Sequence, residues 1–389
     1  MKRKYSYIFI FLSLLMIFSG FVGIQRKVFA DYPIEIESKS AYLMEAETGK
    51  VIFSKEENTR LPIASMCKVM TLLLCFEKIE QNQLFLDENI MISENASGMG
   101  GSQVFLETSG EYKVEDLIKS IIVCSANDAC VAMAERICGS EDMFVELMNE
   151  RAEQLGMENT RFVNCTGLPK EGQYSCAKDV AKMFSELIKH EKYFDYSTIW
   201  MDEIHHPKDR ITQISNTNKL IKFYSGCMGG KTGYTKEAGH CLTAVAQRDS
   251  TKIISVVIGA PDSKTRFNEV SSMFNYAFSN FNTKTIIDNT KPLNFTVEIK
   301  GGKKDSVLVY AEKSIKFFSE KGEKRSFEVI FNKKDNLKAP IKKDECVGTL
   351  DIFEKGVLLK SVNVLSNESV EKQSYYDNLN NLIKNWSIA

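Results

Sequence analysis

The sequence contains few histidines, the residue that metal sites and Ser-His-Asp triads usually need. Among 389 residues there are only four histidines, and they form neither a metal-binding nor a Ser-His-Asp pattern. The ten cysteines include no Cys-x-x-Cys pair, so no zinc site is predicted. A glycine-rich phosphate loop between a strand and a helix is also missing, which argues against a nucleotide. We therefore expect an activity that uses no metal and no cofactor.

The first thirty residues are typical of a secretory signal peptide. Lys2, Arg3 and Lys4 precede an apolar run over 5–24, and Val28-Phe29-Ala30 follows it. This order predicts a signal peptide at 1–30 that is cleaved after Ala30. The alternative is an uncleaved anchor, because about 20 apolar residues can span a bilayer. The Val-x-Ala ending favours cleavage.

Charge and cysteine content bear on the partners and surroundings of the exported chain. Removing five basic residues with the signal peptide leaves 45 basic and 51 acidic residues, a net charge of −6. This balance argues against nucleic acid as a partner. Ten cysteines in a small secreted domain would suggest disulfides. Here most of them lie in apolar runs of a long chain, so we interpret them as small buried hydrophobic residues of a protein in reducing surroundings.

Three short motifs carry polar side chains suited to acyl transfer. They are Ser65-Met66-Cys67-Lys68, Ser125-Ala126-Asn127 and Lys231-Thr232-Gly233. A serine hydroxyl is a weak nucleophile until a base removes its proton, and Ser65 and Lys68 lie one helical turn apart. The apolar run 69–76 predicts a buried helix after the serine, whose N-terminus favours negative charge. Burial opposite Lys231 favours the neutral, proton-accepting form of Lys68.

The third motif is predicted to form a strand that lines a cleft. Residues 231–235 precede the β-rich run 242–246, and glycine at 233 lets a substrate backbone lie close. The N–H groups of Tyr234 and Ser65 are candidates for an oxyanion hole. Taken singly, the motifs fit an ordinary helix cap, a turn and a strand end. Together they are the pattern of β-lactamases and penicillin-binding proteins.

Longer runs extend this similarity over about residues 35–280. The runs 125–129, 148–152, 155–157 and 231–235, with Asn159-Thr160, Gly167-Leu168 and Ala238-Gly239, resemble the D-alanyl-D-alanine carboxypeptidases, the low-molecular-mass penicillin-binding proteins. The resemblance implies an α/β, β-lactamase/transpeptidase-like domain at 31–283. Such a domain would remove the terminal D-alanine from peptidoglycan stem peptides through an acyl-serine intermediate, and β-lactams would acylate the same serine.

The resemblance also assigns roles to the motif residues. It implies Ser65 as the nucleophile, Lys68 as its base, Ser125 and Asn127 as a proton-relay and binding pair, and Lys231, Thr232 and Gly233 as the substrate-holding strand. Relatives often carry an arginine in the segment 215–219, and this chain has none there. A second family arginine, at the end that receives the substrate carboxylate, falls near Arg266. We therefore expect Arg266 and Thr232 to share that role; the alternative is a surface charge on a helix over 266–278.

Two other functions use the same motifs. A β-lactamase needs a route for water to deacylate the serine quickly, commonly a loop carboxylate between the second and third motifs. Glu171 and Asp179 lie in that interval, without a loop pattern typical of that role. A penicillin-binding sensor or scaffold would acylate without useful turnover, and the intact Lys68 and Asn127 argue against it.

The chain changes character beyond about residue 283. Short alternating runs at 295–299, 307–310, 327–331 and 357–359, separated by glycines, predict a small β-sandwich at 284–365. Apolar residues at helical spacing, ending in Trp386, predict an amphipathic helix in the tail 366–389. Such a tail favours the membrane interface, with docking to protein as the alternative. The expected location is therefore extracytoplasmic, on the outer face of the cytoplasmic membrane.

Overall fold

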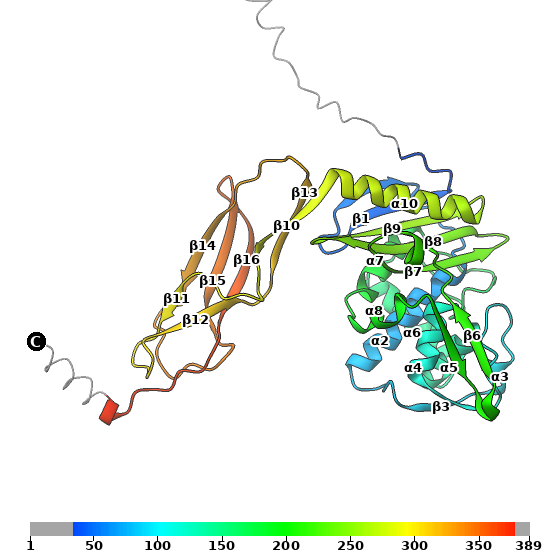
Figure 1. The fold of residues 1–389 in the computed structure, drawn as a ribbon, viewed down its shortest axis with the longest axis horizontal. Coiled ribbons are helices and arrows are strands. Elements are labelled where there is room, and N and C mark those ends of the chain that lie inside the picture. Colours follow the sequence, from blue (N-terminus) through cyan, green and yellow to red (C-terminus); the bar gives the residue numbers. More distant parts are fainter. Residues whose placement is uncertain (1–33, 378–389) are drawn as a thin grey trace, which may run out of the picture. The chain divides into compact units, whose positions relative to one another are not determined.

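A computed structural model describes residues 34–377 (Figure 1). The predicted signal peptide and the end of the predicted amphipathic tail, with Trp386, lie outside the described residues. Within 34–377, no helix is long and apolar enough to cross a membrane. The described chain forms a mixed α/β region followed by an all-β region, as the sequence predicted.

A five-stranded antiparallel sheet with the strand order β2-β1-β9-β8-β7 forms the centre of the α/β region. The strands are β1 (Ser40–Glu45), β2 (Val51–Lys55), β7 (Cys227–Thr235), β8 (Gly239–Arg248) and β9 (Thr251–Ala260). α10 (Ser263–Asn280) lies on one face and α7 (Ala177–Leu187) on the other (Figure 1). Because both faces are covered, β1 and β9 are buried along almost their whole length. β7 is an edge strand, so one side of its backbone is open to a ligand.

Helices around α2 (Lys68–Glu80) form the main hydrophobic core. The first nine residues of α2 are buried, which confirms the helix expected from the apolar run 69–76. Gly139, with φ of +82°, ends α5, and the Ser140 side chain accepts a hydrogen bond from the N–H of Met143 at the start of α6. The remaining elements of this region are η1 (Ala64–Cys67), β3 (Asn89–Met91), α3 (Glu94–Ser97), β4 (Glu111–Lys113), α4 (Val114–Val123), α5 (Asn127–Cys138), α6 (Glu141–Gln154), α8 (Lys192–Ser197), β5 (Met201–His205), η2 (Pro207–Asp209), β6 (Ile211–Ser215) and α9 (Leu220–Phe223).

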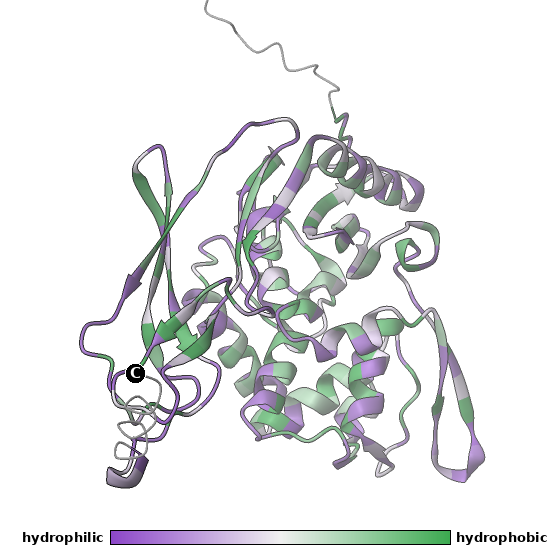
Figure 2. Ribbon diagram, turned by 60° about the vertical axis from the view of Figure 1, so that its left-hand side comes forward, coloured by the Kyte–Doolittle hydropathy of each residue, from purple (hydrophilic) through white to green (hydrophobic). Residues whose placement is uncertain are grey.

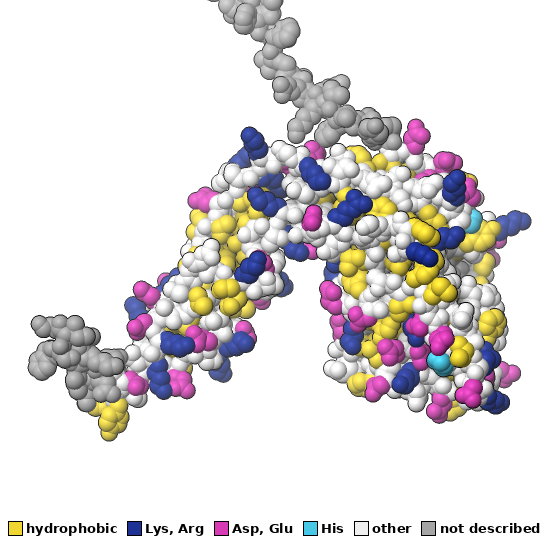
Figure 3. All heavy atoms as spheres, in the orientation of Figure 1, with side chains coloured by type: hydrophobic (Ala, Val, Ile, Leu, Met, Phe, Trp, Pro, Cys, Tyr) yellow, Lys and Arg dark blue, Asp and Glu magenta, His cyan; other side chains and the backbone are white. Residues whose placement is uncertain are grey.

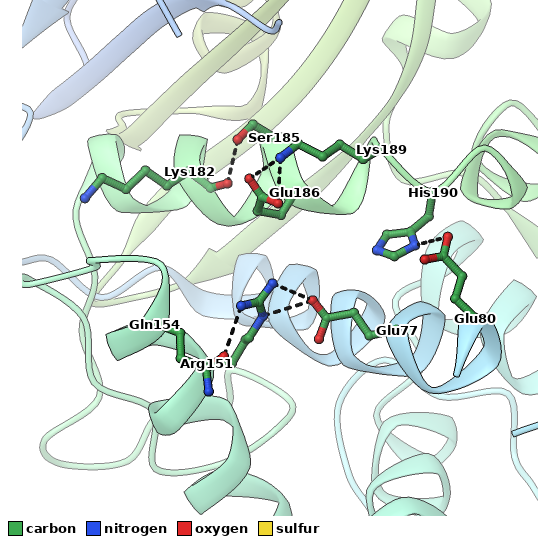
Figure 4. A network of polar contacts seen from close by, with 9 residues as sticks. All are labelled: Glu77, Glu80, Arg151, Gln154, Lys182, Ser185, Glu186, Lys189 and His190. Carbon is green, nitrogen blue, oxygen red and sulfur yellow. Dashed lines mark hydrogen bonds and ion pairs between the residues drawn. The ribbon is translucent and has the colours of Figure 1, made fainter. Parts of the chain in front are cut away.

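Polar contacts join the helices at their outer edges (Figure 4). Glu77 of α2 pairs with Arg151 of α6 at 2.7 Å. One turn further along α2, Glu80 contacts Nδ1 of His190 at 2.6 Å, just after α7. These side chains are partly exposed, so each pair contributes at most about 1 kcal/mol to stability. They link α2 to α6 and to the segment after α7.

The all-β region consists of two sheets. One has the order β11-β12-β16-β15-β14 and the other pairs β10 with β13. Ile315 of β13 shares a core with Val309 and Val364 of the larger sheet. The strands are β10 (Phe281–Ile287), β11 (Thr296–Glu298), β12 (Ser306–Ala311), β13 (Ile315–Glu320), β14 (Glu328–Lys333), β15 (Cys346–Glu354) and β16 (Val357–Ser366). β13 and β15 were not predicted, because charged and polar residues interrupt their apolar pattern.

Hydropathy and charge are distributed as expected for a globular protein. Hydrophobic residues concentrate on the strands and the central helices, whereas many loops are hydrophilic (Figure 2). On the face drawn in Figure 3, acidic and basic side chains are interspersed without a large area of one sign.

Candidate active site

Ser65 lies in η1, directly before α2, on a backbone clamped between two other segments. Ala64 has φ of +48°, an uncommon conformation for alanine. A Cβ at Gly167 would lie 2.0 Å from the carbonyl oxygen of Ala64, and a Cβ at Gly233 would lie 2.7 Å from that of Ile63. Glycine is therefore required at both positions for the loop and β7 to approach the serine this closely.

The Lys68 side chain is fully buried and points at the serine. Its Nζ donates to Ser65 Oγ at 3.1 Å, to Asn127 Oδ1 at 2.6 Å and to the carbonyl oxygen of Thr166 at 2.5 Å. These three acceptors come from η1, the start of α5 and a loop. The first two motifs are thus brought together around one amine.

Ser125 and Lys231 form a second polar pair. Lys231 Nζ donates to Ser125 Oγ at 2.8 Å and to the carbonyl oxygen of Thr232 at 3.1 Å. Ser125 has φ of +68°, a left-handed conformation that serine rarely adopts. Strain of this kind is found at functional sites, where the surrounding structure maintains it. Here it presents the hydroxyl to the lysine of the third motif.

The two buried lysines influence each other electrostatically. Burial, and then the charge of Lys68, lower the pKa of Lys231 to about 7. Lys68 Nζ has three oxygen acceptors, including an amide and a carbonyl. Lys231 has a hydroxyl and the carbonyl of its neighbour.

Asn127 is held at the first turn of α5 by the loop before it. Its backbone N–H donates to the carbonyl oxygen of Ser102 at 2.7 Å, and its Nδ2 donates to that of Gly100 at 2.6 Å. The next residue, Asp128, is buried and accepts hydrogen bonds from the N–H groups of Val104 and Leu106. The Asp128 carboxylate therefore fastens this loop to the helix that carries Asn127.

β7 carries the third motif along the open edge of the sheet. Its residues pair with β8, Lys231 opposite Thr243 and Tyr234 opposite His240, which confirms the predicted strand. Thr232 Oγ1 donates to Thr217 Oγ1 at 2.8 Å. Tyr234 is 61% exposed, and its ring stacks on that of His240 with ring centroids 4.4 Å apart. Backbone, hydroxyl and aromatic groups thus line one side of the site.

Arg266 lies behind this strand and not on the surface. Its side chain is buried, so the alternative of a surface charge is wrong. Nη1 donates to the carbonyl oxygens of Gly233 and Cys241, each at 3.2 Å, and Nη2 donates to Ser263 Oγ at 3.2 Å. Burial lowers the pKa of the guanidinium to about 10. Arg266 therefore joins α10 to β7 and β8 while placing a positive charge beneath the strand.

The two cysteines beside the motifs are packed. Cys67 is buried, and its Sγ donates to the carbonyl oxygen of Asn164 at 3.3 Å. Cys124 donates to the carbonyl oxygen of Ser120 at 3.2 Å. Burial raises the pKa of both thiols, that of Cys124 to about 12. Neither thiol is therefore a nucleophile at neutral pH.

Several residues of the site carry no motif in the sequence. Thr217 contacts Thr232, and Asn164 organises the loop that supplies the Thr166 carbonyl to Lys68. Asn164 Oδ1 accepts from the N–H of Gly167 at 2.7 Å, and its Nδ2 donates to the carbonyl oxygen of Leu168 at 2.9 Å. The only sequence indication for this loop was the family-like pair Gly167-Leu168.

Known proteins are similar to this chain in both sequence and fold. The family model for D-alanyl-D-alanine carboxypeptidase matches residues 27–262, and that for the C-terminal domain of penicillin-binding protein 5 matches 281–372. D-alanyl-D-alanine carboxypeptidase DacF of Bacillus subtilis is 40% identical over 352 residues, which cover 90% of each chain. D-alanyl-D-alanine carboxypeptidase DacC of Escherichia coli is 30% identical over 352 residues, which cover 88% of this chain and 86% of that protein. Penicillin binding protein 5 from Haemophilus influenzae superimposes with a TM-score of 0.66 at 28% identity, covering 87% of this chain and 98% of that one. With its site assembled from these motifs, the chain belongs to the D-alanyl-D-alanine carboxypeptidase family.

Proposed function

We propose that the protein is a serine-type D-Ala-D-Ala carboxypeptidase that removes the terminal D-alanine from peptidoglycan stem peptides. The observation that carries this proposal is the presence of two neighbouring sets of hydrogen-bonded polar groups, contributed by three distant segments. Ser65, Lys68 and Asn127 form one part, and Ser125 and Lys231 form the other, beside an open strand edge. Family membership supports the same conclusion.

In the first chemical step, Lys68 acts as the base for Ser65. Lys68 accepts the proton of Ser65 Oγ, and the oxygen attacks the carbonyl carbon between the two D-alanines. The N–H groups of Ser65 and Tyr234 stabilise the oxygen of the tetrahedral intermediate. The C–N bond then breaks, leaving the peptide as an ester on Ser65.

Ser125 and Lys231 act in the second part of the reaction. A lysine with a pKa of about 7 exchanges protons readily near neutral pH, so Lys231 supplies a proton through the Ser125 hydroxyl to the departing amine. D-alanine leaves as the free amino acid. Water then attacks the acyl-serine and gives a proton to Lys231 through the Ser125 hydroxyl. Lys68 returns its proton to Ser65 Oγ as the ester C–O bond breaks, and the peptide leaves with a new carboxylate.

The substrate is held along β7. Asn127 binds the peptide group, and Lys231 and Thr232 receive the terminal carboxylate. Arg266 contributes from behind the strand, through its positive charge and its hydrogen bond to the Gly233 carbonyl. β-Lactams acylate Ser65 because their strained amide takes the place of the bond between the two D-alanines.

The chain is further proposed to work outside the cytoplasm. The signal peptide at 1–30 exports it, the domain at 31–283 carries the reaction, and the β-sandwich at 284–365 holds that domain away from the membrane. The amphipathic tail at 366–389 binds the outer face of the cytoplasmic membrane. Truncation at about residue 368 is expected to abolish binding to lipid vesicles.

The direct test measures free D-alanine released from a diacetylated tripeptide that ends in D-Ala-D-Ala. Residues 31–389 are expected to release it, a Ser65→Ala variant is not, and Ser185→Ala on α7 serves as the matched control. Release by Ser65→Ala would refute the nucleophile. No release, with penicillin bound covalently at Ser65, would favour the sensor, and rapid turnover of penicillin would favour a β-lactamase. Against the latter, Asp179 already accepts hydrogen bonds from the N–H of Asn159 and from Thr160 Oγ1.

A further inference from the structure

The loop 98–110 holds Asn127 but has no regular structure of its own. The carbonyl oxygens of Gly100 and Ser102 accept hydrogen bonds from the side-chain amide and the backbone N–H of Asn127. A Cβ at Gly101, where φ is +80°, would lie 2.8 Å from Asn127 Nδ2, so the loop lies directly against the amide. Between α3 and β4, this part of the described chain forms neither a helix nor a strand. The position of the loop therefore depends on contacts with other elements.

Arg210, directly before β6 in the hairpin that β5 and β6 form, contacts this loop at two points. Its Nη2 donates to the carbonyl oxygen of Phe105 at 2.5 Å, and its Nε donates to Glu107 Oε1 at 3.2 Å. Phe105 has φ of +61°, an unfavourable conformation for a residue with a large side chain. Such strain persists only where the surrounding structure maintains it. The guanidinium therefore holds the loop at a strained residue.

Two buried aromatic side chains form a second connection between the hairpin and the loop. Tyr112 Oη accepts from the N–H of Glu107 at 3.2 Å and lies 2.8 Å from His206 Nδ1. On the other side of the imidazole, Nε2 lies 2.9 Å from Thr212 Oγ1. Burial, and then the charge of Arg210, lower the pKa of His206, so the ring is neutral at pH 7. Its Nδ1 then accepts the Tyr112 proton, while the Tyr112 oxygen accepts from the loop.

The hairpin is itself fixed to the elements that carry the motifs. Ile204 of β5 and Ile214 of β6 are buried in the main hydrophobic core. After β6, the N–H of Thr217 donates to the carbonyl oxygen of Val123 at 3.0 Å, two residues before Ser125. The hairpin thus connects the segment before the second motif to the loop that holds the asparagine of that motif.

We propose that Tyr112, His206 and Arg210 are positioning residues of the acylation site. Through the loop they fix the Asn127 amide against Lys68 and against the peptide group of a bound substrate. The contact with a peptide rests on the proposed function, whereas the hydrogen bond to Lys68 is present in the structure. Tyr112 and His206 are only 3% and 6% exposed, so they act on a ligand through the loop and not by touching it.

Tyr112→Phe is the first test, because it removes one hydroxyl and keeps the ring. Both hydrogen-bond partners of that hydroxyl are then left unsatisfied, so the loop and Asn127 shift. For acylation by a fluorescent penicillin, the dissociation constant of the noncovalent complex should rise about 3- to 10-fold. The acylation rate constant at saturation should fall by less than about 3-fold, because Lys68 keeps its two other oxygen acceptors.

Matched variants separate positioning from general stability. Tyr196→Phe on α8 removes a similarly buried hydroxyl, which donates to a carboxylate at 3.0 Å, and should leave both constants unchanged. His206→Asn keeps an oxygen acceptor near the place of Nδ1 and should retain most of the binding, whereas His206→Leu should behave like Tyr112→Phe. At the turn of the hairpin, Arg210→Gln should raise the dissociation constant and Lys208→Gln should not.

Equal dissociation constants for Tyr112→Phe and Tyr196→Phe, or for His206→Asn and His206→Leu, would overturn the positioning role. Arg210 is partly exposed, so Arg210→Gln keeps the test valid where a core variant does not fold. Hydrogen exchange needs no ligand: residues 98–110 should exchange faster in Arg210→Gln and Tyr112→Phe than in the two controls, and equal exchange would contradict the role. If the unchanged protein releases no D-alanine, the carboxypeptidase proposal alone fails.

Discussion

Adding one methyl group at Gly233 tests how tightly β7 must lie against the nucleophile. A Cβ there would be 2.7 Å from the carbonyl oxygen of Ile63 and 3.2 Å from the backbone nitrogen of Ser65, whereas ordinary contact begins at 3.4 Å. In Gly233→Ala, β7 and η1 must therefore separate by about 0.7 Å, the shortfall of the shorter contact. This separation moves the Tyr234 N–H away from Ser65 and distorts the oxyanion hole.

The expected loss follows from the size of that displacement. A misplacement of about 1 Å can cost roughly 100-fold in rate, so kcat/KM for the peptide and the rate of penicillin acylation should fall about 10- to 100-fold. Overpacking should lower the free energy of unfolding by about 1–3 kcal/mol. Stopped-flow acylation with a fluorescent penicillin and a urea titration measure the two effects.

A control variant at Gly322, away from the active site, distinguishes a loss of stability from a distortion of the active site. Gly322 has φ of +83° and open space around it, so Gly322→Ala introduces backbone strain of about 1–2 kcal/mol without touching the site. We expect it to lower stability and to leave acylation unchanged. Unchanged acylation in Gly233→Ala as well would refute the argument that the close approach of β7 is needed for catalysis.

Three further predictions concern single groups. Lys231 loses its proton near pH 7 in the folded protein but keeps it in the unfolded chain, so unfolding takes up protons between pH 7 and 8. The contribution of Lys231 to the free energy of unfolding therefore rises with pH by up to about 1.4 kcal/mol per pH unit. Urea midpoints of Lys231→Met should lack that rise, and an identical slope would contradict the argument. Asn164→Ala should destabilise the protein by about 2 kcal/mol and slow acylation, because three loop hydrogen bonds are lost; a normal rate would show that Thr166 is positioned by other contacts. Iodoacetamide at pH 7 should leave the rate of penicillin acylation unchanged, because the Cys67 and Cys124 thiols are packed and have raised pKa values. Rapid inactivation that Cys124→Ala prevents would show that the Cys124 thiol is reactive.

Local pattern predicted the elements that carry the motifs. The apolar run after Ser65 made α2 predictable, and the β-rich runs around 231–246 made β7 and β8 predictable. The regular alternation at 307–310 likewise indicated β12. These elements depend on short-range periodicity, which the sequence displays directly.

Contacts between distant segments could not be predicted in the same way. The hydrogen bond of Lys68 to Thr166 spans 98 residues, and that of Lys231 to Ser125 spans 106. The burial of Arg266 behind β7 also depends on how α10 packs across the sheet. No local spacing contains this information, so Thr217 and Asn164 were missed.

Residue types and their spacing define which chemical groups are available: a serine and lysine one turn apart, a hydroxyl and amide pair, and a strand with a glycine at its centre. How these groups share their protons depends on the packing of distant segments. This packing buries two lysines together, gives Lys68 three oxygen acceptors, and lowers the pKa of Lys231 to about 7. The physical reason is that desolvation and charge repulsion depend on the environment that distant segments create, whereas residue type and spacing are properties of the chain alone.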